Sequence, residues 1–210
     1  MNLEEIRVIV RRDLHDLDDT NYRWSDEVLN GHIYHAVRDL SESCPLEEKS
    51  LVATSNGSRE IDISDIDGLI IVEAVEYPEG QVPRNYQRFS LWGNTITILN
   101  ETVPDGSNAA IYYGKLHTLG DSSSSIPAWQ EELIVCGAAG YSALEWAVYA
   151  VNRVNTGGSQ TTTELEDWAN TKLTFFRKEL KRLHRKNRIR VRTLYLTGVT
   201  PVNKTTDFGP

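Results

Sequence analysis

The residues of this 210-residue chain that are best suited to chemistry are its five histidines, its two cysteines and a few clustered acids. His32 and His35 stand three residues apart and could offer two imidazoles to a metal, but no cysteine or third ligand follows at zinc-site spacing. Asp16, Asp18 and Asp19 resemble the start of a calcium loop, yet the glycine and the final glutamate of that motif are missing. We therefore predict no metal centre, and interpret these groups as solvated histidines and turn-forming acids.

Motifs for catalysis and cofactor binding are also missing from the sequence. It contains no glycine-rich phosphate loop, no dinucleotide fingerprint and no Gly-x-Ser-x-Gly nucleophile elbow. Acid pairs such as Glu131 and Glu132 fit a helix start, so nothing singles out a hydrolytic pair. Two cysteines are too few for a disulfide framework, and Cys136 is typical of a buried, reduced thiol. We expect no catalytic residue, no cofactor and no enzymatic activity.

Charge is distributed unevenly along the chain. The segment from Thr171 to Arg192 holds ten Lys or Arg residues and one acid, which leaves twelve basic and twenty-nine acidic residues elsewhere. The net charge of −8 therefore divides into about +9 on one segment and −17 on the rest, and such asymmetry indicates a binding partner. The residues predicted to form the cationic face of an amphipathic helix are Arg177, Lys178, Lys181, Arg182, Arg185 and Lys186.

Three interpretations of this basic helix, residues 172–192, stay open. It could dock onto an acidic protein surface, including that of a neighbouring copy. It could be a solvated helix end, where the dipole favours positive charge. It could also contact the phosphate backbone, as in a nucleic-acid-binding accessory protein, although only Tyr195 offers a stacking aromatic beyond the run. We favour protein docking and keep nucleic-acid binding as the alternative.

Residues 189–210 follow the basic helix and have no visible core of their own. Ile189 and Val191, and then Leu194 and Leu196, alternate with polar neighbours, which predicts a strand without a mate in the sequence. An unpaired strand tends to add to the sheet edge of another chain. The residues expected to contact that partner are Arg188, Arg190, Val191, Arg192, Leu194, Tyr195 and Leu196.

Four helices are predicted from the apolar periodicity, over residues 2–18, 25–43, 126–154 and 162–187. Asn2 and Glu5 have capping-box spacing, and Ser25 is a good N-cap for the second helix. A face of small residues in the third helix predicts that another helix approaches closely. That face consists of Cys136, Gly140, Ala143, Ala147 and Ala150.

Residues 50–114 change to a period of two and predict five or six short antiparallel strands. Asn56-Gly57 predicts a hairpin between Leu51–Thr54 and Glu60–Ile63, and a second hairpin is expected around Gly93. The predicted fold class is α+β: a bundle of about four helices with an inserted antiparallel β block, followed by an extended C-terminal tail. We expect one domain over residues 1–188 and the tail over residues 189–210.

Composition and the first residues bear on where the protein works. Hydrophobic residues make up 40% and charged residues 25% of the chain, which is ordinary for a globular protein. The longest apolar stretch, residues 133–154, is interrupted by Glu145, Asn152 and Arg153 and predicts a buried helix, not a membrane span. The acidic start has no secretory-signal pattern, so we expect a protein of the cytoplasm or of a particle assembled there.

Several short segments occur in an order that matches a known family. They are Tyr22–Leu29, Ala36–Leu40, Trp92–Ile98, Pro104–Gly106 before Ile111–Tyr113, and Ile126–Pro127 before Cys136–Tyr141. Together they cover most of the chain from about residue 22 to 150, and it is their order that carries the likeness. In this arrangement the chain resembles the head-to-tail adaptor proteins of tailed bacteriophages, which are also called head-completion or connector proteins.

The resemblance implies a structural virion protein of the phage neck, assembled in the host bacterial cytoplasm. Such proteins form a ring, commonly of twelve copies, beneath the portal and continue the DNA channel toward the tail. The implied partners are other copies of the chain, the portal protein and a tail-proximal neck or tail protein. DNA would pass through without sequence-specific binding, and no membrane would be involved. Residues 189–210 would reach the portal or a neighbouring subunit, and the sizeable β block departs from compact members of the family.

Overall fold

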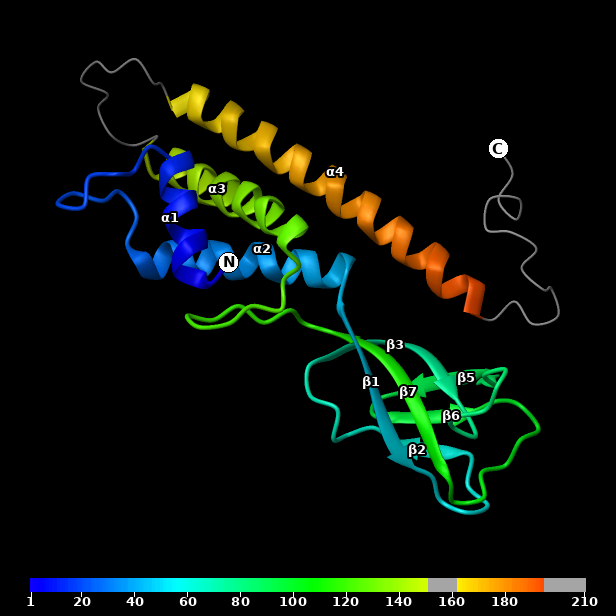
Figure 1. The fold of residues 1–210 in the computed structure, drawn as a ribbon. Helices are drawn as coiled ribbons and strands as arrows, with labels where there is room; N and C mark the ends of the chain where they lie inside the picture. Colours follow the sequence, from blue (N-terminus) through cyan, green and yellow to red (C-terminus); the bar gives the residue numbers. More distant parts are fainter. Residues whose placement is uncertain (151–161, 195–210) are drawn as a thin grey trace. The chain divides into compact units, whose positions relative to one another are not determined.

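The computed structural model describes residues 1–150 and 162–194, with side chains for residues 1–149 and 162–187. The α+β class is confirmed, with four helices and seven strands in the described part of the chain (Figure 1). The chain divides into two compact units. Of the described residues, the helical unit holds Met1–Leu46 and residues 116–150 and 162–184, and the β unit holds Glu47–Lys115 together with residues 185–194.

Helix α1 spans Leu3–Asp13 and is shorter than the predicted 2–18. Its predicted capping box is confirmed, because Asn2 Oδ1 accepts from the Glu5 backbone and Glu5 accepts from the Asn2 backbone, both at 2.9 Å. The helix ends early because the next residues bind elsewhere. The carboxylate of Asp16 accepts a hydrogen bond from the Arg23 backbone at 2.8 Å, and this fixes the loop before the second helix.

Helix α2 spans Asp26–Ser43, close to the predicted 25–43. Ser25 caps it as predicted, with its hydroxyl oxygen accepting from the Val28 backbone at 3.3 Å. Helix α3 spans Ala128–Ala150, two residues inside the predicted start, and residues 151–154 lie outside the described chain. None of the described helices combines the length and the apolar character needed to cross a lipid bilayer.

Helix α4 spans Thr162–Leu194, seven residues beyond the predicted end. Its 33 residues correspond to a rod of about 50 Å. The strand predicted from Ile189 is therefore wrong as far as Leu194, and the remainder of that prediction lies outside the described residues. The arginines that alternate with Ile189 and Val191 favour helix, so continuing an existing helix outweighs the strand preference of two β-branched residues.

Helices α3 and α4 approach closely, as the small-residue face predicted (Figure 1). A Cβ atom added at Gly137 would lie 2.9 Å from the ring of Phe176, and one added at Gly140 would lie 2.8 Å from Cγ of Leu173. Both facing side chains are buried. The core of the helical unit combines this contact with the inner faces of α1 and α2, through residues that include Ile6, Val10, Leu29, Ile33, Leu40, Ile134 and Phe176.

The β unit contains strands over residues 46–115, slightly wider than the predicted 50–114. They form two antiparallel sheets, in the orders β1-β7-β3-β4 and β2-β6-β5. The strands are β1 Leu46–Ala53, β2 Glu60–Asp62, β3 Leu69–Glu76, β4 Tyr86–Gln87, β5 Phe89–Trp92, β6 Thr95–Ile98 and β7 Asn108–Lys115.

One of the two predicted hairpins is correct. The β5–β6 hairpin forms around Gly93, with Trp92 opposite Thr95. The hairpin predicted at Asn56-Gly57 is wrong, because β1 and β2 belong to different sheets. The turn itself exists, with Gly57 at a φ of 80°, but the Gly57 N–H donates to the carbonyl of Pro104 at 2.8 Å. A contact distant in the sequence has replaced the local pairing.

Candidate protein-docking surfaces

The exposed face of α4 carries the cations that the sequence placed there. On the opposite side, Phe176, Leu180 and Leu183 are buried in the helical unit. The division follows from the period of 3.6 residues, which brings the apolar residues onto one stripe. The exposed basic residues are Arg177, Lys178, Lys181, Arg182, Arg185 and Lys186.

Few acids offset this positive charge. The Nε of Arg182 donates to Oε2 of Glu179 at 2.8 Å, one turn earlier on the same helix. Neighbouring cations at i and i+4 repel one another, so an acidic partner surface would be attracted to this face. Among the side chains that the structure describes, no ion pair within 4.0 Å involves Lys178, Lys181, Arg185 or Lys186.

The residues predicted to contact a partner at the C-terminal end are divided by the end of α4. Arg188, Arg190, Val191, Arg192 and Leu194 belong to the helical backbone instead of a strand. Tyr195 and Leu196 lie outside the described residues. The first part of the expected strand, up to Leu194, is therefore a continuation of the cationic helix.

A second surface, which the sequence did not predict, is an apolar groove of about 740 Å³ in the helical unit. We call it the α1–α4 groove. Two large aromatic side chains stand exposed beside it, Trp129 of α3 at 64% and Phe175 of α4 at 55%. The residues that line it are Met1, Ile9, Arg12, Asp13, Trp129, Glu132, Leu133, Val135, Cys136, Trp168, Thr171, Lys172, Phe175, Glu179, Arg182 and Leu183.

Charged groups surround the groove but largely neutralise one another. The Nζ of Lys172 lies 3.0 Å from Oδ2 of Asp13 and joins α4 to α1. The pair of Arg182 with Glu179 lies farther along α4. The groove thus combines an apolar centre with a charged rim in which two ion pairs are formed, and an apolar centre with a polar rim is the usual anatomy of a protein interface.

The sequence did contain a signal for the groove. Trp129 and Phe175 fall outside the apolar stripes that predicted the buried faces of their helices, and both are exposed. A single exposed apolar residue is ordinary, whereas two large aromatics beside one groove are not. What the sequence could not supply was their proximity, because that depends on how α1, α3 and α4 pack.

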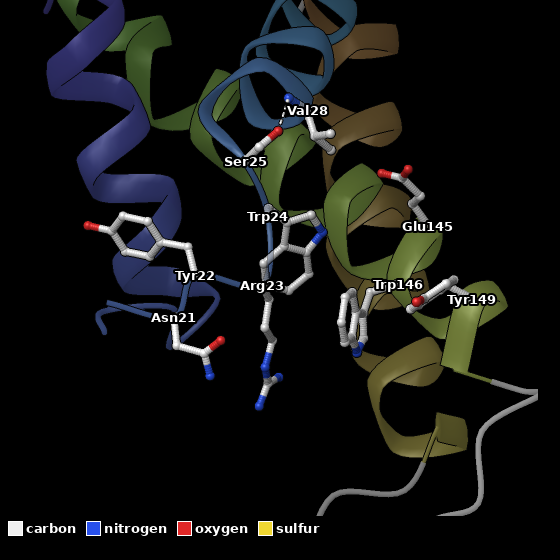
Figure 2. Close-up of a pocket in the computed structure, with 9 residues that line it drawn as sticks. All are labelled: Asn21, Tyr22, Arg23, Trp24, Ser25, Val28, Glu145, Trp146 and Tyr149. Carbon is white, nitrogen blue, oxygen red and sulfur yellow. Dashed lines mark hydrogen bonds between the residues drawn. The ribbon is translucent and has the colours of Figure 1, made fainter. Parts of the chain in front are cut away.

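A second hollow, of about 620 Å³, lies at the other end of α3. Figure 2 shows Trp24 and Trp146 side by side, with Tyr149 next to Trp146 and Arg23 extending past them. The ring centroids of Trp24 and Trp146 are 5.5 Å apart, and Nε1 of Trp24 donates to the carbonyl of Ser142 at 3.1 Å. This Trp24 contact anchors the loop before α2 onto α3.

Two aromatic rings at this hollow are already in contact with arginine side chains of the same chain. The guanidinium of Arg11 lies 3.6 Å from the ring centroid of Tyr22, and that of Arg23 lies 6.0 Å from the Trp146 ring. Arg11 is also buried against Asp16, with Nη1 donating to Oδ2 at 2.6 Å. Because the aromatic faces already hold internal cations, we assign this hollow to the architecture of the loop.

Three of the five histidines, His32, His35 and His117, have structural partners of their own. The Nε2 of His32 lies 2.5 Å from Oε2 of Glu145, and the ring of His35 stacks on Tyr141 with centroids 4.2 Å apart. Burial lowers the pKa of His117, whose ring nitrogens face the backbone oxygens of Cys44 and Ser125. Within residues 1–149 and 162–187, no group of three or more His, Cys, Asp or Glu side chains could hold a metal ion.

Comparison with known proteins returns no match, either to a protein-family model or to a curated protein. The cationic face of α4 and the α1–α4 groove are therefore the features of the chain that bear on its function.

Proposed function

We propose that this protein is a structural component of the neck of a tailed bacteriophage. It forms a ring that joins the portal to the tail machinery and continues the DNA channel. In this role it is a non-enzymatic virion protein, assembled in the bacterial cytoplasm, and its partners are its own copies, the portal and a tail-proximal protein. The ordered segments between residues 22 and 150 that resemble adaptor proteins are the starting point of the proposal.

The observation that carries the proposal is the cationic face of α4. Lys178, Lys181 and Arg185 point away from the core with no acid partner among the described side chains, on a chain whose remaining residues are strongly acidic. A ring in which the basic face of one copy meets the acidic surface of the next would neutralise both. The β unit, inserted between α2 and α3, would give each copy a second, separately folded surface for another component of the neck.

Electron microscopy of particles that contain this protein tests the proposal directly. We expect a ring of density between portal and tail, with a copy number of about twelve, into which the helical and β units fit. Antibody labelling of purified particles should mark the same position. Absence of the protein from the neck would refute the proposal, whatever the protein binds in isolation.

A truncation tests the contribution of the C-terminal residues to assembly. Because α4 continues to Leu194, the cut belongs after that residue, not at Ile189, where it would shorten the helix. Phage encoding residues 1–194 should accumulate DNA-filled heads without tails, and supplying the full chain from a plasmid should restore tailed particles. Normal tailed particles with the truncated protein alone would contradict this role.

Nucleic-acid binding by α4 is the second candidate function, favoured by the cations on its exposed face. A phosphate-binding face loses affinity steeply as salt increases, because each neutralised phosphate releases counterions. Titrating duplex DNA at several salt concentrations distinguishes the two candidates. An adaptor in isolation should bind DNA weakly, whereas an accessory protein should show micromolar affinity that falls with salt and depends on Lys181 and Arg185.

A further inference from the structure

We infer that the α1–α4 groove is the docking site for residues Tyr195–Pro210 of a second copy of this chain. This inference rests on the proposed ring for the presence of the second copy, and it names the contact between neighbours. In the helical unit the groove places exposed aromatic surface from α3 and α4 beside the partly buried Ile9 and Leu133. Exposed aromatic surface around a concave apolar centre is typical of an interface hot spot.

The charge of the groove selects its occupant. The side chains that line the groove include three bases, Arg12, Lys172 and Arg182, and three acids, Asp13, Glu132 and Glu179, so their formal charges balance. Two of the bases are in ion pairs, Lys172 with Asp13 and Arg182 with Glu179. An occupant that brought several charges would have to desolvate them without gaining ion pairs. The groove therefore favours an apolar segment of low net charge.

Residues 195–210 have that character, whereas most of the chain does not. The sixteen residues contain one base, Lys204, and one acid, Asp207, so their net charge is zero. The preceding helix is strongly cationic and the rest of the chain is acidic. The large apolar residues of the segment are Tyr195, Leu196, Val199, Val202 and Phe208.

The length of the segment is also sufficient. The α4 part of the groove, from Trp168 to Leu183, corresponds to about 22 Å of helix. Sixteen extended residues span up to about 53 Å, so the segment can bridge a gap between copies and still cover the groove.

Geometry favours a neighbouring copy over the same chain. From Leu183 to Leu194, α4 extends about 16 Å beyond the groove. A segment that bound the groove of its own chain would have to reverse direction after Leu194. Part of its length would then run back along α4 before it reached the groove. With one groove and one segment per chain, docking from each copy into the next is a heterologous contact, and such contacts form a ring where the rotation between successive copies closes.

Photocrosslinking in the full-length protein tests the inference. Phe175 is replaced by p-benzoylphenylalanine, and equal amounts of ¹⁵N-labelled and unlabelled chains are mixed before irradiation. We expect crosslinks from position 175 to peptides within residues 195–210, with mixed-isotope products showing that two chains are joined. The same photoreactive residue at Trp92, which is 89% exposed in the β unit, is the matched control and should not react with that segment.

Association measurements supply the second readout. Trp129→Ala combined with Phe175→Ala should weaken self-association of the full chain by about tenfold or more, since both residues are exposed and their loss leaves the core intact. Trp92→Ala should leave self-association unchanged. Crosslinks only within one chain, crosslinks to other segments, or no effect of the groove variants would each overturn the inference. Microscopy of the neck is independent of these results, so the proposed function and this contact can fail separately.

Discussion

The contact between α3 and α4 is critical because α4 carries both docking surfaces, and Gly140→Ala tests it. In the native structure the new methyl group would lie 2.8 Å from Cγ of Leu173, 2.9 Å from its Cδ2 and 3.4 Å from the carbonyl oxygen of Ala169. Leu173 and Ala169 are buried, so the side chain cannot swing into solvent. The two helices must therefore move apart or distort.

Two opposing effects set the magnitude. Alanine is favoured over glycine in a helix by about 1 kcal/mol, whereas overpacking a close-packed core costs about 1–3 kcal/mol. Because the clash involves a branch atom and a backbone oxygen, we expect the upper half of that range. The free energy of unfolding of the helical unit should fall by about 1–2 kcal/mol.

Gly31→Ala is the matched control. Gly31 lies within α2, and a Cβ atom added there would meet nothing within 4 Å. This variant should gain up to about 1 kcal/mol from helix propensity alone. Urea unfolding followed by circular dichroism at 222 nm, which reports mainly on the helices, measures both variants.

Removing the Leu173 side chain shows whether the loss of stability in Gly140→Ala comes from a clash with Leu173 or from a general effect of the substitution on the helix. In a Leu173→Ala background the atoms that block position 140 are absent, so Gly140→Ala should become neutral or stabilising. The double-mutant cycle should show a coupling of about 1 kcal/mol or more. Strictly additive effects, or a Gly140→Ala variant as stable as Gly31→Ala, would refute the close-packing argument.

Two further predictions concern a buried ion pair and a titrating carboxyl group. Asp16→Ala removes the buried partner of the Arg11 guanidinium, at 2.6 Å, and leaves the more exposed Asp26, at 2.7 Å, as its remaining ion pair. The loss should be about 2 kcal/mol in thermal or urea unfolding. Asp19→Ala, exposed in the same loop, should change stability by less than about 0.5 kcal/mol, and equal losses would contradict this. The hydrogen bond from Tyr77 is the main cause that lowers the pKa of Asp105 to about 2, so its contribution to the stability of the β unit is complete above the unfolded pKa of 3.8 and is lost as the pH falls toward 2. Tyr77→Phe should raise that pKa toward 3.8 in an NMR titration, and a carboxyl group that still titrates near 2 would contradict the assignment.

Features encoded by neighbouring residues could be predicted from the sequence. The caps at Asn2 and Ser25 depend on side chains that bond to backbone three residues away. The cationic face of α4 follows from a period that a single helix imposes. The face of small residues on α3 also follows from spacing. The close helix approach that it predicted is confirmed, because Gly140 leaves room for Leu173 of α4.

Features decided by distant partners could not be predicted in this way. The Asn56-Gly57 turn has the local chemistry of a hairpin, yet the carbonyl of Pro104 takes the Gly57 N–H and β2 pairs with β6. Helix α1 was predicted too long because its end is set by Asp16, whose carboxylate pairs with Arg11 and binds the backbone of the following loop.

The same distinction, between features set by neighbouring residues and features set by distant ones, applies to the candidate site. The cationic residues were named from the sequence, because exposure on one helix face needs only that helix. The groove was missed, because it exists only where α1, α3 and α4 meet. Exposed Trp129 and Phe175 come from different helices, and no spacing in the sequence relates them.

Three consecutive residues of α4 illustrate why one helix can serve several partners. Phe175 borders the groove, Phe176 is buried against α3 and Arg177 is exposed on the cationic face. Successive residues of an α-helix are about 100° apart around its axis, so these three directions cannot meet one flat partner surface. The apolar groove and the cationic face therefore suit two different contacts, one that buries hydrophobic area and one that depends on charge and weakens with salt. A protein that must bind its own copies and the components on either side of a ring needs such a separation.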